Sequence, residues 1–241
     1  MVATDRDEVS PVVPPATMVR IARLPCCVRV AAGAEDLQDV AGLRARAYGR
    51  RVPRLAAQLQ QLEPIDLLPG STVLLARSRA DGRPLGTVRL QHRAAAPLAL
   101  EGSVALPAPL CALRVAEVGR LCIDRAAPPG VRMALFKAVW RLAGAAAFDW
   151  LVVVARGAMV RVYERLGYRD LLGPAHEVPM RHIADLPHRL LGLDVGRAAA
   201  ELDREHRLYE FLVATCHPDI QVPAAAGWPR GADSPRAAVT A

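Results

Sequence analysis

The chain has 241 residues, of which 52% are hydrophobic and only 4% aromatic, and its net charge is +7. This length and hydrophobic content predict one well-buried domain with extensions. Lys137 is the only lysine, so arginine carries the positive charge, and the arginines are dispersed without aromatic interleaving, zinc-ligand spacing or a helix-turn-helix pattern. We therefore expect acidic partners but no nucleic acid.

Cysteine and histidine spacing gives no sign of a metal site or a disulfide framework. The five cysteines are odd in number and lack C-x-x-C spacing, and the six histidines include no H-x-x-x-H pair. His176 and His182 are interpreted as surface or packing residues. The first residues are acidic where a secretory signal would be basic and then apolar, and no uncharged apolar stretch is long enough for a membrane span. The sequence predicts a cytoplasmic protein with no membrane span.

The first half of the chain alternates strand and helix patterns. Residues 26–31 read CCVRVA and predict a strand, and 34–48 predict an amphipathic helix with apolar residues on one face. A second helix is predicted over 54–62. Asp81 and Gly82 stand between two strand-like runs, which predicts a β-hairpin.

The next part begins with an irregular segment over 94–110. A strand is predicted over 115–123 and a helix over 131–146. Residues 149–155 form a nearly continuous apolar run, as expected for a strand that is covered on both faces.

The last part is predicted to hold a helix over 158–166, stopped by Gly167, then a final strand over 176–183 and a C-terminal helix over 197–215. The order of elements predicts an α+β fold with a mixed central β-sheet flanked by helices. No internal repeat is present.

The domain organisation follows from these patterns. We expect a flexible N-terminal segment over 1–25 and a flexible tail over 221–241, because neither is periodic and the tail is dominated by proline, alanine and glycine. The folded domain is predicted over 26–183, and a C-terminal helical extension over 184–220.

Five short motifs occur in a characteristic order: LRARAY, DLLPGSTVLLA, GRPLGTVRL, EVGRLCI and VYERLGY. Over about residues 27–182 this order resembles the N-acyl amino acid synthases and the related acyl-homoserine-lactone synthases. These families have the GNAT acyltransferase fold, so the resemblance implies a GNAT-like domain over 26–183. Their Glu-x-Ser-Arg motif has Gly119 at the serine position here, which removes a hydroxyl group.

The loop before the central helix departs from that of GNAT enzymes that use coenzyme A, which carry Arg/Gln-x-x-Gly-x-Gly/Ala there. Pro128 and Pro129 have no N–H to offer a pyrophosphate, whereas a single phosphate needs fewer donors. The resemblance therefore implies acyl-phosphopantetheine on an acyl carrier protein as donor, or alternatively acyl-CoA. Gly130, Val131 and Arg132 are the expected donor-binding residues, and no cofactor is expected to be permanently bound.

The predicted central helix also carries positive charge. Arg132, Lys137 and Arg141 lie near one side of it, and carrier proteins are acidic, so we predict a basic docking face. The alternative is that these charges only solvate an exposed helix face.

Amide formation from a thioester requires a neutral amine and a proton for the departing thiolate. The resemblance assigns the proton donor to Tyr163, whose alternative role is to pack beside Leu166. Glu117 is predicted to deprotonate the incoming ammonium, directly or through water. Alternatively it pairs with Arg120 or Arg89 and holds the site in shape. Arg120 belongs to the predicted catalytic set.

In the GNAT fold the central strand separates from its neighbour and offers backbone N–H groups to the thioester carbonyl. The resemblance assigns that strand to 115–123 and donor contacts to Leu121, Cys122 and Ile123. An acceptor carboxylate suits a bidentate arginine. We expect the acceptor, a small-molecule amine, at Arg44 with Tyr48, the aromatic residue of LRARAY, or at Arg89.

The sequence thus predicts a cytoplasmic N-acyltransferase that moves a fatty acyl group from an acyl carrier protein to the amine of an amino acid or similar small molecule. One alternative is a signal synthase of the acyl-homoserine-lactone type that uses S-adenosylmethionine. A second is a CoA-dependent acetyltransferase with an atypical loop. A third is a domain without turnover that binds acyl groups or carrier protein.

Overall fold

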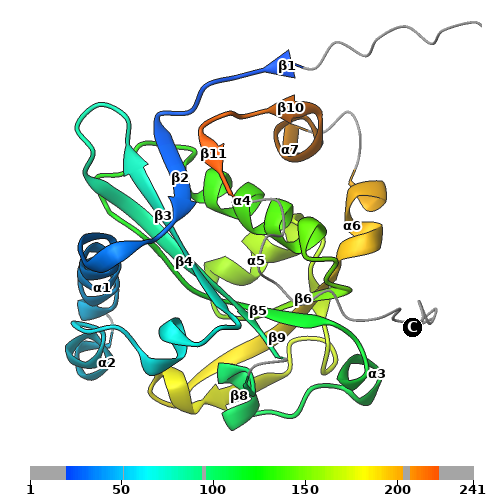
Figure 1. The fold of residues 1–241 in the computed structure, drawn as a ribbon. Helices are drawn as coiled ribbons and strands as arrows, with labels where there is room; N and C mark the ends of the chain where they lie inside the picture. Colours follow the sequence, from blue (N-terminus) through cyan, green and yellow to red (C-terminus); the bar gives the residue numbers. More distant parts are fainter. Residues whose placement is uncertain (1–19, 51, 94–95, 203–206, 223–241) are drawn as a thin grey trace, which may run out of the picture.

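The computed structural model describes residues 20–50, 52–93, 96–202 and 207–222 (Figure 1). The flexible ends that we predict lie mostly outside these residues. The strands are β1 (Arg20–Ile21), β2 (Cys26–Val30), β3 (Ser71–Ser78), β4 (Pro84–His92), β5 (Val115–Ile123), β6 (Trp150–Ala155), β7 (Arg169–Asp170), β8 (Glu177–Met180), β9 (Leu186–Asp194), β10 (Thr215–Cys216) and β11 (Ile220–Gln221).

The helices lie between and after these strands. They are α1 (Gly33–Gly49), α2 (Pro53–Gln58), α3 (Ala108–Cys111), α4 (Val131–Ala145), α5 (Ala158–Arg165), α6 (Val195–Glu201) and α7 (Arg207–Tyr209). Short 3-10 turns are η1 (Pro64–Leu67), η2 (Ala99–Gly102) and η3 (Arg181–Ile183), and η4 (Glu210–Ala214) is a π-helical turn. In the described part of the chain, no helix has the length and apolar character needed to cross a membrane.

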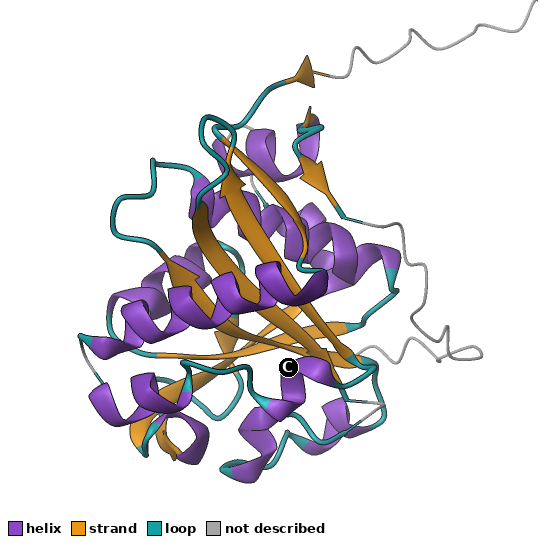
Figure 2. Ribbon diagram, turned by 60° about the vertical axis from the view of Figure 1, so that its left-hand side comes forward, coloured by secondary structure: helices purple, strands orange, loops and turns teal. Residues whose placement is uncertain are grey.

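One mixed sheet forms the centre of the fold. Its strand order is β11-β2-β3-β4-β5-β6-β9-β7, and β8 also pairs with β9. The pairs β2–β3, β3–β4 and β4–β5 are antiparallel, whereas β11 is parallel to β2 and β5 is parallel to β6. Strand β6 is antiparallel to β9. Figure 2 shows helices on both sides of the sheet. The predicted α+β fold with a mixed, helix-flanked sheet is confirmed.

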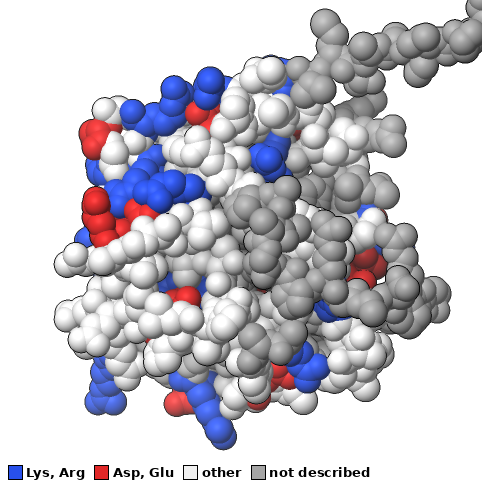
Figure 3. Space-filling model, viewed as in Figure 1, with Lys and Arg blue, Asp and Glu red and all other residues white. Residues whose placement is uncertain are grey.

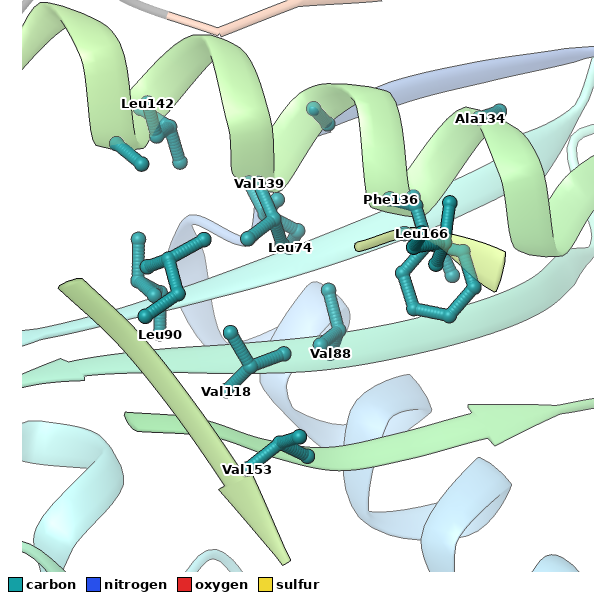
Figure 4. Packing of buried hydrophobic residues seen from close by; sticks show 14 of the residues in the cluster. Leu74, Val88, Leu90, Val118, Ala134, Phe136, Val139, Leu142, Val153 and Leu166 are labelled. Carbon is teal, nitrogen blue, oxygen red and sulfur yellow. The ribbon is translucent and has the colours of Figure 1, made fainter. Parts of the chain in front are cut away.

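The two faces of the sheet pack against different helices, because successive strand residues point to opposite faces. On β3, Val73 and Leu75 pack against α1, whereas Leu74 and Ala76 belong to the main core on the face that α4 covers. Figure 4 shows Val139 and Leu142 of α4 above Leu74 and other core side chains. Truncating such a buried leucine to alanine typically costs about 2–5 kcal/mol, so α4 is firmly fixed to the sheet.

The β3–β4 hairpin forms where the sequence predicts it. Gly82 has a φ of 73°, a left-handed conformation that glycine adopts at little cost. The Ser78 N–H donates to the Arg83 carbonyl oxygen at 2.9 Å, which closes the turn.

Surface charge near this hairpin is balanced locally. Asp36 of α1 accepts hydrogen bonds from Arg29 at 2.5 Å and from Arg77 at 2.9 Å, and Arg77 also pairs with Asp39 at 2.5 Å. Figure 3 shows basic and acidic side chains interspersed on the face viewed as in Figure 1. Arg29 and Arg77 are therefore paired with carboxylates of the chain near this hairpin.

The prediction that 176–183 supplies the final strand is wrong. Strand β9 follows it, in the segment 184–220, and pairs with β6 along the whole of β6. The reversal between β8 and β9 uses Ala184 and Asp185, both left-handed with φ near 55°. Aspartate tolerates this conformation better than alanine does, and the usual Asn-Gly or Asp-Gly pair is missing, so the sequence carries only a weak signal for a tight hairpin.

The C-terminal helix predicted over 197–215 is not one continuous element. Helix α6 ends at Glu201, and the later residues form α7, η4 and the short strands β10 and β11. β10 pairs with β1 and β11 with β2. The described part of the predicted range after Glu201 is helical from Arg207 to Ala214, and strand pairing begins at Thr215.

Candidate active site on strand β5

Strand β5 separates from β6 in the middle of the sheet. The two strands pair only from Val115 to Glu117, after which β6 continues beside β9 and β5 continues beside β4. Among the described residues, no strand pairs with this edge of β5 beyond Glu117. Leu121, Cys122 and Ile123 lie in that stretch, as predicted, so their backbone is the part of β5 available to a donor.

A β-bulge interrupts β5 at the same place. Arg89 of β4 is opposite Gly119 and Thr87 is opposite Cys122, so β5 carries one extra residue. Arg120 takes up the irregularity with a φ of 53°, which is unusual for a residue with a side chain. Bulges of this kind turn a side chain away from its regular direction, and Arg120 is directed to a carboxylate outside the sheet.

That carboxylate is Glu63, which lies just before η1. Arg120 binds both of its oxygens, through Nε at 2.6 Å and through Nη2. Arg89 Nη1 lies 3.1 Å from Glu63 Oε2, and Arg44 Nη1 lies 3.6 Å from the same oxygen. Asp66 binds Arg44 at 2.5 Å and 3.0 Å and Arg89 at 3.3 Å. Three arginines and two carboxylates therefore form one network.

The network changes the proton affinity of its members. Burial alone would raise the pKa of Glu63, but the hydrogen bonds and charge of Arg120, aided by Arg89 and Arg44, lower it to about 2. Burial acts to lower the pKa of Arg120, and its bonds to Glu63 outweigh this and raise it. Both groups stay ionised throughout the neutral range, so the network is a permanent feature of the site.

The predicted acceptor residues belong to this network. Arg44 has no exposed surface and Arg89 is 1% exposed, and each already binds carboxylates of the chain. This is the arrangement expected of structural ion pairs. Tyr48 lies beneath Arg120, whose guanidinium carbon is 5.6 Å from the ring centre, within reach of a cation–π interaction.

Glu117 lies on the same face of β5 as Gly119. Its side chain is buried, and its Oε2 accepts a hydrogen bond from the Leu100 N–H at 3.0 Å. Its Oε1 is buried and has no hydrogen-bond partner within the described structure. Burial raises the pKa of Glu117 against the opposing effects of the Leu100 N–H, Arg89 and Arg120.

The alternative role of Glu117, an ion pair with Arg120 or Arg89, is not formed in the described structure. Both arginines direct their ion pairs to the carboxylates near η1, Glu63 and Asp66. The histidine His182 of η3 is closer to Glu117, with Nε2 at 3.9 Å from Glu117 Oε1.

Tyr163 of α5 is buried among aromatic rings. Its ring meets those of Phe136 and Tyr168 edge to face, with centroids 5.5 Å and 5.1 Å away. Burial raises the pKa of Tyr163, Tyr48 raises it further, and the charge of Arg132 has a smaller lowering effect. The phenol therefore keeps its proton at neutral pH, as a proton donor must, and its packing role is also present.

The loop between β5 and α4 offers few backbone donors. Pro128 and Pro129 have none, and the N–H groups of Ala126 and Ala127 already bond to Asp124 at 2.9 Å and 3.1 Å. The other amides of the loop are those of Arg125 and Gly130, and the helix start adds amides that a helix leaves without internal partners. There Gly130 is left-handed, Val131 is buried and Arg132 is exposed.

The basic docking face predicted on α4 is wrong for Lys137. Its side chain is buried, and its ammonium donates to the carbonyl oxygens of Phe211, at 2.6 Å, and Thr215. Arg141 donates to the Ile220 carbonyl oxygen at 2.8 Å. Lys137 and Arg141 hold the C-terminal segment against α4. Of the predicted docking face, Arg132 and Arg141 are exposed and Lys137 is not.

Comparison with known families decides the assignment. The model of the family described as N-acyl amino acid synthase FeeM matches residues 39–186, more than half of the chain. The chain belongs to the FeeM family. It is accordingly an N-acyltransferase with the GNAT fold, and the matched segment contains the β5 edge and the whole arginine–carboxylate network.

Solved structures agree on the fold. FeeM from uncultured soil microbes superposes with a TM-score of 0.60 at 15% identity, covering 74% of this chain and 95% of that one. The CoA-dependent acyl-homoserine lactone synthase BjaI, solved with SAM and isopentyl-CoA, gives 0.53 at 14% identity, covering 83% and 97%. A putative N-acetyltransferase from Lactobacillus plantarum gives 0.50 at 18%, covering 71% and 99%. A search of curated proteins found no match.

Two members of this FeeM-family site were missed from the sequence. Glu63 lies outside the DLLPGSTVLLA motif, although the Glu-Pro pair ahead of Asp66 has the pattern of a capped turn, which η1 forms. His182, which the sequence pattern indicates as a surface or packing residue, is the second. Its proximity to Glu117 depends on the β8–β9 hairpin, for which the local sequence carries only a weak signal.

Proposed function

We propose that this chain transfers a fatty acyl group from a thioester donor to the amine of an amino acid or a similar small molecule, on the edge of β5 beyond Glu117. The observation that carries the proposal is a buried carboxylate with one unpartnered oxygen at the point where β5 leaves β6. Membership of the FeeM family supports the reaction class.

The proposed chemistry uses groups of the chain at each step. Glu117 first takes one proton from the ammonium, and the neutral amine nitrogen then attacks the thioester carbonyl carbon and forms the C–N bond. Backbone N–H groups of the Leu121–Ile123 stretch stabilise the oxyanion, a contribution worth about 10²–10³ in rate per donor. The C–S bond then breaks, and Tyr163 gives its proton to the thiolate. The second proton that the nitrogen loses on becoming an amide passes through solvent to restore the Tyr163 phenol after Tyr163 has protonated the thiolate.

The arginines have a different proposed role from the one predicted. We propose that Arg44 and Arg89 position Glu63 and Asp66, and through Glu63 fix Arg120 on the bulge, in place of a contact with the acceptor's carboxylate. The support is that both guanidiniums are buried and engaged. Leaving any of these buried charges without its partner would cost several kcal/mol.

Acyl carrier protein is the donor that we propose. The loop ahead of α4 has two prolines and two amides bonded to Asp124, so it suits one phosphate better than a pyrophosphate. Free acyl-CoA is the rival donor, since BjaI is described as CoA-dependent. The five cysteines are all free thiols, which supports the proposed cytoplasmic location.

The test compares matched donors. The purified chain is given palmitoyl–acyl carrier protein or palmitoyl-CoA with a mixture of the common amino acids, and thiol release and amide products are measured by mass spectrometry. We expect an N-acyl amino acid, with kcat/KM at least about ten-fold higher for the carrier-protein donor, equivalent to about 1.4 kcal/mol. Equal or better use of CoA would contradict the proposed donor, and no amide from either would contradict the function.

A further inference from the structure

Two neighbouring side chains, Glu117 and His182, each have a buried polar atom without a hydrogen-bond partner in the described structure. These atoms are Glu117 Oε1 and His182 Nδ1. Buried polar atoms in native proteins are nearly always bonded, so an unpaired group marks a place where a ligand or water completes the bonding. Glu117 Oε1 faces Nε2 of His182, and the unpaired Nδ1 is the other nitrogen of the same ring. The unpaired carboxylate oxygen is therefore the atom beside His182 that lacks a partner.

The separation between the two side chains is suited to a bridging group. His182 Nε2 is 3.9 Å from Glu117 Oε1, too far for a direct hydrogen bond. A single nitrogen or oxygen placed between them can lie within about 2.8–3.0 Å of both. An amine is well matched to this place because it supplies more than one N–H.

A hydrogen bond to the backbone of His182 holds η3 in place, and a glycine leaves the space beside Glu117 unfilled. Arg120 Nη2 donates to the His182 carbonyl oxygen at 3.0 Å, which ties η3 to the arginine–carboxylate network. Gly119 has no side chain to fill the space: a Cβ there would lie 3.6 Å from both Glu117 Oε1 and Arg89 Nη2. The site is thus bordered by β5, β4 and η3.

His182 has the protonation state that such a contact needs. Burial lowers its pKa, and the charges of Arg120 and Arg89 lower it further, to about 4. A neutral imidazole has one N–H and one lone pair, whichever tautomer is present. The His182 side chain is 17% exposed and that of Glu117 only 2%, so an incoming amine meets His182 first.

Resting on the proposed function, we infer that His182 is an acceptor-binding residue: its imidazole and the free oxygen of Glu117 together hold the acceptor's amine for attack on the thioester. Glu117 receives the proton that the ammonium loses, and His182 accepts a hydrogen bond from the same nitrogen. The attacking lone pair is then oriented before the C–N bond forms.

The test uses three substitutions at His182 and one matched control. His182→Gln retains an amide near the position of Nε2, His182→Phe removes both nitrogens at similar volume, and His182→Ala leaves room for added imidazole. His176→Gln is the control, because His176 is an exposed histidine beside the same hairpin. KM for the acceptor and KM for the acyl donor are measured separately, with the amino acid that the wild-type chain acylates fastest.

We expect His182→Phe to raise the acceptor KM by roughly 10- to 100-fold, as for the loss of one hydrogen bond to a charged group. The donor KM should stay within about two-fold, His182→Gln should lie between wild type and His182→Phe, and imidazole should restore part of the activity of His182→Ala. An unchanged acceptor KM in folded His182→Phe, or equal changes in both KM values, would overturn the inference. If the wild-type chain acylates no amino acid, the proposed function fails instead.

Discussion

Glu63 is the centre of the arginine–carboxylate network, so its charge offers a quantitative test of the site. The substitution Glu63→Gln keeps the side-chain size and removes the charge that faces Arg120, Arg89 and Arg44. Its pKa falls from 4.5 to about 2 in the folded chain. Converted at about 1.4 kcal/mol for each pH unit, this corresponds to about 3 kcal/mol of stability. The typical cost of breaking a buried ion pair is of similar size, about 3–5 kcal/mol.

The effect has a defined pH dependence. Because the pKa of Glu63 is lowered by folding, its contribution is fully present above about pH 4.5 and is lost as the pH falls through 2. Urea unfolding of wild type and Glu63→Gln should therefore differ by about 3 kcal/mol near pH 7 and by about a third less near pH 3.5.

Glu164→Gln provides the matched control. Glu164 pairs with Arg189 at 2.9 Å, but its side chain is 42% exposed, and exposed pairs contribute only about 0–1 kcal/mol. If Glu63→Gln costs no more than Glu164→Gln, or if its cost is the same at both pH values, the reasoning about the network is refuted.

Three further predictions address other parts of the chain. Tyr163→Phe keeps the ring packing, so thiol release should fall by about 10²–10⁴ with an unchanged melting temperature; a change of less than two-fold would remove Tyr163 from the mechanism. Lys137→Met removes the donor to two carbonyl groups, and limited proteolysis should cut the 207–222 segment faster, with a loss of about 1–3 kcal/mol; an unchanged digestion rate would contradict the role of Lys137. Gly119→Ser places a hydroxyl within reach of Glu117, so its free energy of unfolding should be about 1 kcal/mol higher than that of Gly119→Ala. Equal free energies of unfolding would show that the hydroxyl finds no partner.

Local sequence patterns were sufficient for most of the fold. The apolar periodicity of α1 and α4, the Asp81–Gly82 turn and the continuous apolar run of β6 each report on a structure formed within a few residues. The β8–β9 reversal shows where this fails. Ala184 and Asp185 adopt left-handed conformations because the two strands pair, and nothing in their local sequence demands it.

In the candidate site, too, the positions of residues on local elements were predictable, whereas contacts between distant segments were not. Glu117, Arg120 and Tyr163 lie on elements that the motifs mark, and β5 separates from its neighbour β6, as the resemblance implies. The partners of charged groups were not predictable, because they join segments far apart in the chain. Lys137 illustrates this: on a helical wheel it belongs to an exposed basic face, but the C-terminal segment folds over it and buries it.

The most direct test of the account is a crystal structure with an unreactive acyl-pantetheine analogue in which a methylene group replaces the thioester sulfur. We predict that its carbonyl oxygen accepts a backbone N–H from the Leu121–Ile123 stretch, on the edge of β5 that β6 leaves, with Glu117 and His182 facing the carbonyl carbon. An analogue bound elsewhere on the molecule, or a carbonyl oxygen turned away from β5, would contradict the assignment of this edge as the acyl-transfer site.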